Sequence, residues 1–385
     1  MKIAFIGQKG IPTKTGGVER YVENLATNMV KVGHEVTVYS RSSYNTEKLK
    51  EWNGIRIITT PAIASKNLDA ITSTFFACLD LVRRHYDIIH IQSIGPGSLL
   101  WLAKLLKPRT KVVFTFHCQD YYHKKWGRFA KWYLKFGEVV GNRLADKVFT
   151  VSKSLAQYAK DHYGAEALCI PSSAQVSPLV PADEITKHWG LTKDSYLVSI
   201  GRLVRHKGIH YLIKAYQELT TDKKLVIVGD GSFTDDYVTE LKELAATNPN
   251  IIFTGNQTGQ TLKELYSNAA IFVQPSESEG LSFALIEAMS YARPCVVSNI
   301  DSNREALADA GIYFEDRNYQ DLRDKLQTLL DEPEQLAAYG QAALARVKKE
   351  YEAGKIAHDM IAAYEEVLNR KKVSVPISPS PALPK

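Results

Sequence analysis

The chain has 385 residues, 45% of them hydrophobic and 23% charged, which is too long for one ordinary core, so we expect two domains in a soluble globular protein. The formal net charge of +6 favours an anionic partner. The four cysteines form no C-x-x-C pair, which argues against a disulfide framework or a zinc site, and we expect buried, reduced thiols. No apolar run approaches the roughly 18 residues of a membrane span, so we expect a cytoplasmic protein.

The chain opens with a β-α-β pattern. KIAFIG, residues 2–7, predicts a buried strand, a helix follows from Val18, and HEVTVYS, residues 34–40, predicts a second strand. Gly16 and Gly17 stand at the start of that helix. Two interpretations of this glycine pair stay open. Bare backbone N–H groups at the positive end of a helix suit a phosphate, but two glycines also suit a tight turn.

Three further strands are predicted in the first half, in DIIHIQS, KVVFTFH and KVFTVS, and helical stretches separate them. This alternation predicts a parallel sheet that is covered on both faces and binds ligands at the carboxyl ends of its strands. Gly7, His117 and Ser152 fall at such ends, as does the glycine pair.

Residues 123–136, HKKWGRFAKWYLKF, combine aromatic and basic side chains. Trp126, Phe129, Tyr133 and Phe136 recur at intervals of three and four residues, and lysines and arginines cover much of the rest. The pattern is typical of a helix at an anionic membrane surface, which would make the protein peripheral at the inner face of the cell membrane. The alternative is a helix that packs its aromatic side chains into the N-terminal domain.

The proline-rich residues 171–182 mark the expected linker between domains 1–170 and 183–350. The strand and helix pattern then restarts, with strands predicted in YLVSIGR, KLVIVGDG, NIIFTGN, AIFVQPS and PCVVSN. Two similar halves of this kind would face each other across a cleft. We expect a C-terminal helix over 351–370 that packs back on the N-terminal domain, and a disordered tail over 371–385.

Residues 276–294, SESEGLSFALIEAMSYARP, carry the strongest chemical signal. Ser282 is predicted to cap a helix, which places Glu279 in the preceding loop and Glu287 within the helix. The amides of Gly280, Leu281 and Ser282 at the helix start suit an anion, and the two carboxylates suit hydroxyl groups on either side. A phosphate between hydroxyl-bearing groups describes a nucleotide sugar.

Glu279 and Glu287 form an E-x7-E pattern, which resembles the signature of retaining glycosyltransferases of family four. GRLVRHKG, residues 201–208, resembles the diphosphate-binding loop of that family, and TGGVERYVENLA resembles its N-terminal glycine loop. Other stretches are similar to a bacterial branch of rhamnosyl- and galactosyltransferase-like proteins that build polysaccharides. The resemblance implies the GT-B fold, in which two Rossmann-like, doubly wound parallel-sheet domains face each other across a cleft, with the acceptor on the N-terminal side.

The resemblance also implies roles for individual residues. Glu287 would bind the ribose hydroxyls and Glu279 the donor sugar, Arg202 and Lys207 would hold the diphosphate, and His117 would lie near the transferred sugar. The expected catalytic group is therefore His117, Arg202, Lys207 and Glu279. The donor would also meet backbone amides of Gly16, Gly17, Gly280, Leu281 and Ser282.

The expected reaction is hexosyl transfer from a nucleoside-diphosphate sugar to a glycan hydroxyl, on a polyprenyl-linked or other lipid-linked acceptor, with retention of anomeric configuration. We expect no cofactor and no nucleic acid. We also expect no metal, because Asp235 and Asp236 are interpreted as carboxylates at a helix start. A nucleotide-sugar epimerase of the same architecture is the alternative. Ser172 and Ser173 replace an asparagine-glycine pair that is common in the family, so the contact usually made there is in doubt.

Overall fold

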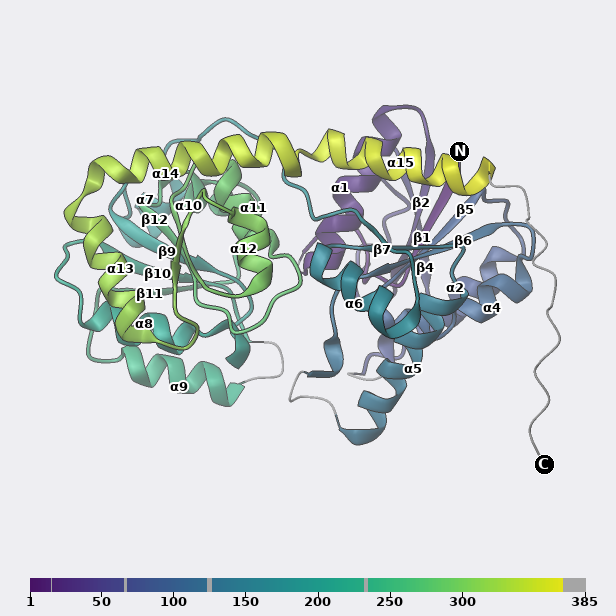
Figure 1. Cartoon of the computed structure of the whole chain (residues 1–385), viewed down its shortest axis with the longest axis horizontal. Helices are drawn as coiled ribbons and strands as arrows, with labels where there is room; N and C mark the ends of the chain where they lie inside the picture. The colour runs from purple at the N-terminus through teal and green to yellow at the C-terminus, as the bar shows by residue number, and fades with distance from the viewer. Residues whose placement is uncertain (15, 66–67, 123–126, 232–234, 370–385) are drawn as a thin grey trace.

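The computed structural model describes residues 1–14, 16–65, 68–122, 127–231 and 235–369. The two halves are α/β layers joined by a linker and by a long C-terminal helical segment (Figure 1). The predicted tail over 371–385 lies outside the described residues.

The N-terminal half is built around a sheet in which, among the described residues, eight strands run in the order β3-β4-β2-β1-β5-β6-β7-β8. All of its pairs are parallel except the antiparallel β3 and β4. Its elements are β1 Lys2–Ile6, α1 Gly17–Lys31, β2 Glu35–Arg41, β3 Glu51–Trp52, β4 Ile55–Thr60, α2 Asp69–Leu81, β5 Ile88–Gln92, α3 Ile94–Gly97, α4 Leu100–Leu106, β6 Lys111–Phe116, η1 Asp120–Tyr122, α5 Arg128–Leu144, β7 Lys147–Thr150, α6 Lys153–Tyr163 and β8 Leu168–Cys169.

The C-terminal half has a parallel sheet in which six described strands run in the order β11-β10-β9-β12-β13-β14. Its elements are α7 Glu184–Trp189, β9 Tyr196–Ile200, η2 Arg205–Lys207, α8 Ile209–Gln217, β10 Lys224–Val228, α9 Asp235–Ala245, β11 Ile251–Gly255, α10 Gly259–Asn268, β12 Ile271–Gln274, α11 Phe283–Ser290, β13 Cys295–Ser298, α12 Asp301–Leu307, β14 Ile312–Phe314, α13 Tyr319–Asp331 and α14 Pro333–Arg346.

The central strands explain why the sequence predicted a sheet with two covered faces. All five residues of β5 are buried, as are four of the five in β1. A strand buried on both sides has no solvent-facing positions, so it shows a continuous apolar run rather than alternation. The sequence prediction omitted the alternating strand β4, in which Arg56 and Thr59 are exposed, and the short strands β3, β8 and β14.

Strand order determines where each half can bind a ligand. In the N-terminal sheet β1 lies between β2 and β5, and in the C-terminal sheet β9 lies between β10 and β12. Each is the point at which the chain reverses its direction of travel through the sheet, and ligands of such sheets bind beyond the carboxyl ends of the strands there. Gln92 ends β5 and Gln274 ends β12, so both lie at these edges.

Two described segments pass from one half to the other, and they are hydrogen-bonded to each other at the crossing. The Ala174 N–H, in the linker, donates a 3.0 Å hydrogen bond to the carbonyl of Tyr351, which ends the π-helical segment Val347–Tyr351. The last helix, α15 (Ala353–Asn369), then packs on α1 of the N-terminal half. Its Tyr364 hydroxyl lies 2.6 Å from Nδ1 of the buried His90 on β5.

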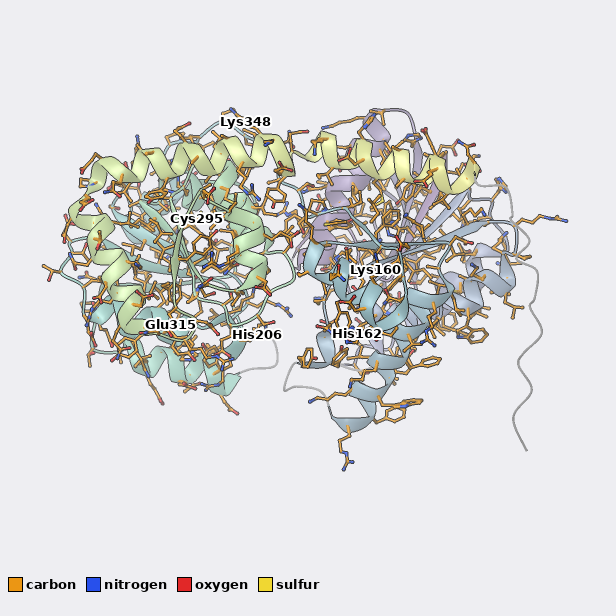
Figure 2. All side chains as sticks on the ribbon, viewed as in Figure 1. Lys160, His162, His206, Cys295, Glu315 and Lys348 are labelled. Atoms are coloured by element: carbon orange, nitrogen blue, oxygen red, sulfur yellow. The ribbon has the colours of Figure 1, made fainter. Side chains whose placement is uncertain are left out.

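The cysteines correct one expectation. Cys78 and Cys295 are buried, but Cys118 and Cys169 are only partly so, which departs from the prediction of four buried thiols. Cys118 follows the end of β6 and Cys169 ends β8, so both lie at the carboxyl ends of N-terminal strands. Figure 2 shows Cys295 within the C-terminal half and Lys348 on the outer surface of the crossing segment.

Candidate active site between the two halves

His117 follows β6 and stands at the edge of the N-terminal sheet. Its Nε2 lies 2.7 Å from Oε1 of Gln92, and the Tyr21 ring on α1 meets the imidazole edge-on, with ring centroids 5.0 Å apart. Burial lowers the pKa of His117 to about 3, because a charged imidazole loses its hydration there. The ring is therefore neutral at physiological pH, and the Gln92 carbonyl makes Nε2 the protonated nitrogen.

The glycine pair has two distinct local roles. Gly16 has φ +110°, and a Cβ added there would lie 1.9 Å from Oε2 of Glu19, so turn geometry alone accounts for glycine at this position. Glu19 also accepts a 2.8 Å hydrogen bond from the Lys9 N–H, which ties the preceding loop to α1. A Cβ on Gly17 would lie 3.6 Å from the Phe283 ring, so Gly17 faces the first turn of α11 across the domain boundary.

The loop between β12 and α11 brings the C-terminal half to His117. Ser282 caps α11 as predicted, with its hydroxyl accepting from the Leu285 N–H at 3.4 Å and bonding to the Gln274 amide at the end of β12. Gly280 lies so close to His117 that an added Cβ would be 2.5 Å from its carbonyl oxygen. Any larger residue at 280 would therefore require the backbone at His117 or at the loop to shift.

Lys207 and Glu279 form a largely buried ion pair beside this loop. Lys207 comes from the turn after β9, and Figure 2 shows its neighbour His206 on the side of the C-terminal half that faces the N-terminal half. Burial opposes the charge on Glu279, but Lys207 outweighs it, so the pKa of Glu279 is lowered. Arg202 lies in the same turn, is exposed, and has no carboxylate within ion-pair distance in the described parts of the chain.

Glu287 projects from α11 toward α1. Its Oε1 lies 3.9 Å from the Arg20 guanidinium, an ion pair that joins the two halves. Burial raises the pKa of Glu287, and the Arg20 charge and the Tyr266 hydroxyl only partly offset this effect. This carboxylate is therefore incompletely paired in the free protein, unlike Glu279.

The structure thus brings most of the predicted residues to one boundary. Contacts link His117 to Gly280, Gly17 to the start of α11, and Glu279 to Lys207. Leu281 is buried next to the cap. Arg202 shares the turn of Lys207, but among the described residues it forms no ion pair with the others.

Sequence reasoning missed two residues at this boundary, Gln92 and Arg20. Gln92 is a polar residue that ends an apolar run, which was a signal in the sequence, and Arg20 lies inside the glycine-loop motif TGGVERYVENLA. Ser172 and Ser173 are buried, and the Ser173 carbonyl accepts a 2.8 Å hydrogen bond from Asn24 of α1, so this pair supports the packing of the linker.

The arrangement supplies three kinds of recognition in one place. The exposed Arg202 and the paired Lys207 offer cations for an anion, the start of α11 offers backbone amides at the positive end of the helix, and the two carboxylates offer acceptors for hydroxyl groups. Within the described residues, no group of three or more His, Cys, Asp or Glu side chains is placed to hold a metal ion.

Two family models match the chain, one in each half. "Glycosyltransferase Family 4" matches residues 15–171 and "Glycosyl transferases group 1" matches residues 182–346. An uncharacterized glycosyltransferase of Methanocaldococcus jannaschii is 25% identical over 335 residues, covering 80% of this chain and 83% of that protein. The alpha-monoglucosyldiacylglycerol synthase of Streptococcus pneumoniae is 24% identical over 311 residues, covering 74% of this chain and 68% of that protein.

Among solved structures, Anabaena HepE in complex with UDP and glucose is similar to this chain with a TM-score of 0.78 at 19% identity. The likeness covers 95% of this chain and 100% of that one. It confirms the expected fold of two facing α/β domains.

Proposed function

Because the chain belongs to the GT-B glycosyltransferases of family-four type, we propose that it transfers a sugar from a nucleoside-diphosphate sugar to an acceptor hydroxyl. The observation that carries this proposal is the boundary around α11, where the Lys207–Glu279 pair and Glu287 flank the helix start. The match to two glycosyltransferase models does not favour the epimerase alternative.

The donor is proposed to bind along the first turn of α11. The Arg20 guanidinium is 3.9 Å from Oε1 of Glu287, a long ion-pair distance, so we expect the carboxylate to accept hydrogen bonds from the two ribose hydroxyls. The diphosphate would meet Arg202, Lys207 and the amides at the start of α11, and the sugar would lie near His117 and Glu279. The UDP and glucose bound to HepE support this class of donor.

Retention of configuration is proposed to proceed without a protein nucleophile. Glu279 is tied to Lys207, and Glu287 lies on the expected ribose side, so neither is a free carboxylate for a double displacement. The acceptor hydroxyl would attack from the face of the departing diphosphate and pass its proton to that phosphate. Arg202 and Lys207 would stabilise the growing charge, without a metal ion.

The acceptor is proposed to be a lipid-linked glycan. The pneumococcal relative is named for a glucosylated diacylglycerol, which supports an acceptor at a membrane. The wider proposal of a polyprenyl carrier rests on the resemblance to polysaccharide-building enzymes.

A thermal-shift screen of nucleotides and nucleotide sugars tests the donor. A ligand at a hundred times its dissociation constant stabilises a protein by about 2.7 kcal/mol, and we expect nucleoside diphosphates to exceed the monophosphates. Incubation of the best donor with a glycan acceptor, followed by proton NMR of the new linkage, tests the transfer and its stereochemistry. Conversion of the donor without acceptor, or an inverted linkage, would contradict the proposal.

A further inference from the structure

Three neighbouring helices of the N-terminal half expose large apolar side chains, and together we name their outer surface the three-helix face. Helix α4 packs against both α2 and α5, and Figure 1 shows α2 and α4 away from the C-terminal half, with α5 at the lower edge. Soluble proteins rarely expose this many apolar side chains together unless they bind something. Apart from those on α5, the main exposed side chains are Phe75, Leu79, Val82, Trp101 and Leu105.

Helix α5 contributes an aromatic ridge. Phe129, Trp132 and Phe136 are 76%, 61% and 41% exposed, and each ring lies within about 6 Å of the next, at centroid distances of 5.8 and 6.1 Å. The sequence predicted a different stripe. Tyr133 points inward to the Ser98 hydroxyl of the α3 turn, and Trp126 lies outside the described residues. The alternative of aromatic side chains packed into the domain is wrong for Phe129, which is almost fully exposed.

The face is rich in positive charge. Glu138, the only acidic residue on α5, is buried, whereas Arg128, Lys135 and Arg143 are exposed. Lys104 and Lys107 of the α4 region donate hydrogen bonds to the carbonyls of Leu144 and Val82, so they hold the C-terminal ends of the three helices together.

The acidic side chains near this face are paired. Asp80 on α2 bonds Arg84, and Asp146 after α5 bonds Lys104. Each pair is neutral overall, so the charges around the aromatic ridge that lack an ion-pair partner among the described residues are basic.

We propose that the three-helix face docks on an anionic lipid bilayer, with the aromatic ridge of α5 at the level of the headgroups. Aromatic side chains with long basic neighbours suit that interface, because the rings enter the apolar boundary while the lysine ammonium groups reach the phosphates. The core of a protein–protein interface is instead depleted of lysine, and here lysine or arginine occurs on successive turns of α5 beside the rings.

The same helix is connected to the candidate active site. On the side of α5 opposite the ridge, Glu138 accepts hydrogen bonds from Tyr158 and Tyr163 at 3.0 and 2.6 Å, and a longer one from Tyr121 at 3.5 Å. Tyr121 lies in the η1 turn, four residues after His117. A bilayer in contact with α5 would therefore lie close to the short segment that connects His117 to the η1 turn. The acceptor side of the candidate active site would then face the membrane.

Flotation with vesicles of phosphatidylcholine, with or without phosphatidylglycerol, tests the proposal using the full chain and no substrate. We expect binding only with phosphatidylglycerol, and a loss of at least tenfold between low and physiological salt. The double variant Phe129→Ser/Trp132→Ser and the triple variant Arg128→Gln/Lys131→Gln/Lys135→Gln should each lower binding at least tenfold. All of these positions are exposed or partly exposed, so the fold is expected to persist.

Matched controls distinguish binding through the three-helix face from non-specific adsorption to vesicles. Val32→Ser/Leu179→Ser removes exposed apolar side chains outside α2, α4 and α5, and Lys160→Gln/Lys349→Gln removes exposed charges outside these helices, so both should bind as the unaltered protein does. The proposal is overturned if the unaltered protein fails to float with anionic vesicles at low salt, or if the control variants lose as much binding. A concentration-dependent dimer that Phe129→Ser/Trp132→Ser abolishes, without vesicle binding, would assign the face to a second copy instead. None of these outcomes depends on the proposed reaction.

Discussion

Nε2 of His117 lies 2.7 Å from the amide oxygen of Gln92, and both side chains are buried at the edge of the N-terminal sheet. A carbonyl oxygen can only accept a hydrogen bond, so the contact requires the proton on Nε2 and leaves Nδ1 as the acceptor nitrogen. A neutral imidazole held in this tautomer can accept from a sugar hydroxyl. Gln92 therefore orients the ring rather than contacting the reacting atoms.

Replacement of Gln92 tests this relationship. Gln92→Glu places a carboxylate beside Nε2 and should raise the pKa of His117 from about 3, because a negative neighbour favours the imidazolium. We expect a new loss of activity on the acid side of the pH profile and a titrating His117 signal in NMR spectra. Gln92→Met has a similar shape without an acceptor, so it should lower turnover but leave the pH profile unchanged. Identical profiles for all three proteins would show that Gln92 does not control the ring.

Glu287→Gln should weaken donor binding and stabilise the free protein. An amide oxygen replaces a carboxylate that binds two hydroxyls, so we expect a loss of about 1–3 kcal/mol in calorimetry. Burial raises the pKa of Glu287, so the folded state favours its protonated form and the ionised form destabilises the fold. Stability of the free protein should therefore rise as the pH falls from 7 toward that raised pKa, whereas donor affinity should fall.

The variant Glu35→Gln, at an exposed carboxylate on β2, is the matched control and should change neither property. Unchanged donor affinity in Glu287→Gln would contradict the role of Glu287 at the ribose.

Arg202 and Lys207 should differ when each is replaced by alanine. Arg202 is exposed and unpaired within the described residues, so Arg202→Ala should leave the melting temperature unchanged and lower kcat about 100-fold, more than it lowers donor affinity. Lys207→Ala leaves Glu279 buried without its partner and should also cost about 3 kcal/mol of stability. The double variant Lys207→Ala/Glu279→Gln should regain stability but not activity. An effect of Arg202→Ala on KM alone would contradict its catalytic role.

Chelation should leave the reaction intact. In the proposed mechanism Arg202 and Lys207 neutralise the departing diphosphate, so activity measured in excess EDTA should equal activity without it. A loss that magnesium or manganese restores would show that a metal performs this task.

Tyr364→Phe should weaken the attachment of α15. The change removes the 2.6 Å contact to Nδ1 of His90 and leaves a buried ring nitrogen without a partner, which costs about 1–3 kcal/mol of unfolding free energy. Urea denaturation measures this loss. Tyr122→Phe is the control, because Tyr122 is 71% exposed, and an equal loss in the two variants would contradict the argument.

The sequence was most informative where one element determines a residue's position. The continuous apolar runs of β1 and β5 predicted a covered parallel sheet, and the Ser282 cap and the positions of Glu279 and Glu287 followed from local helix signals. The pairing of Glu279 with Lys207 was beyond sequence reasoning, because these residues are 72 positions apart and meet only through the order of β9 and β12.

Contacts between the halves were even harder to predict from the sequence. The Arg20–Glu287 pair depends on how closely the domains approach, which no local pattern encodes. On α5 the three- and four-residue spacing predicted a helix, but both Trp132 and Tyr133 fit such a spacing. The neighbouring Ser98 hydroxyl decides that Tyr133 turns inward and Trp132 outward.

The hydrogen bond between Ala174 and Tyr351 joins the only two described segments that pass from one half to the other. Two tethers that meet at one place define a pivot, so relative motion of the halves reduces mainly to rotation about that place. Displacement grows with distance from the pivot. Figure 2 shows Lys348 beside the crossing and His206 far from it, so a small rotation moves the turn that carries Arg202 and Lys207 much farther than it moves the crossing itself.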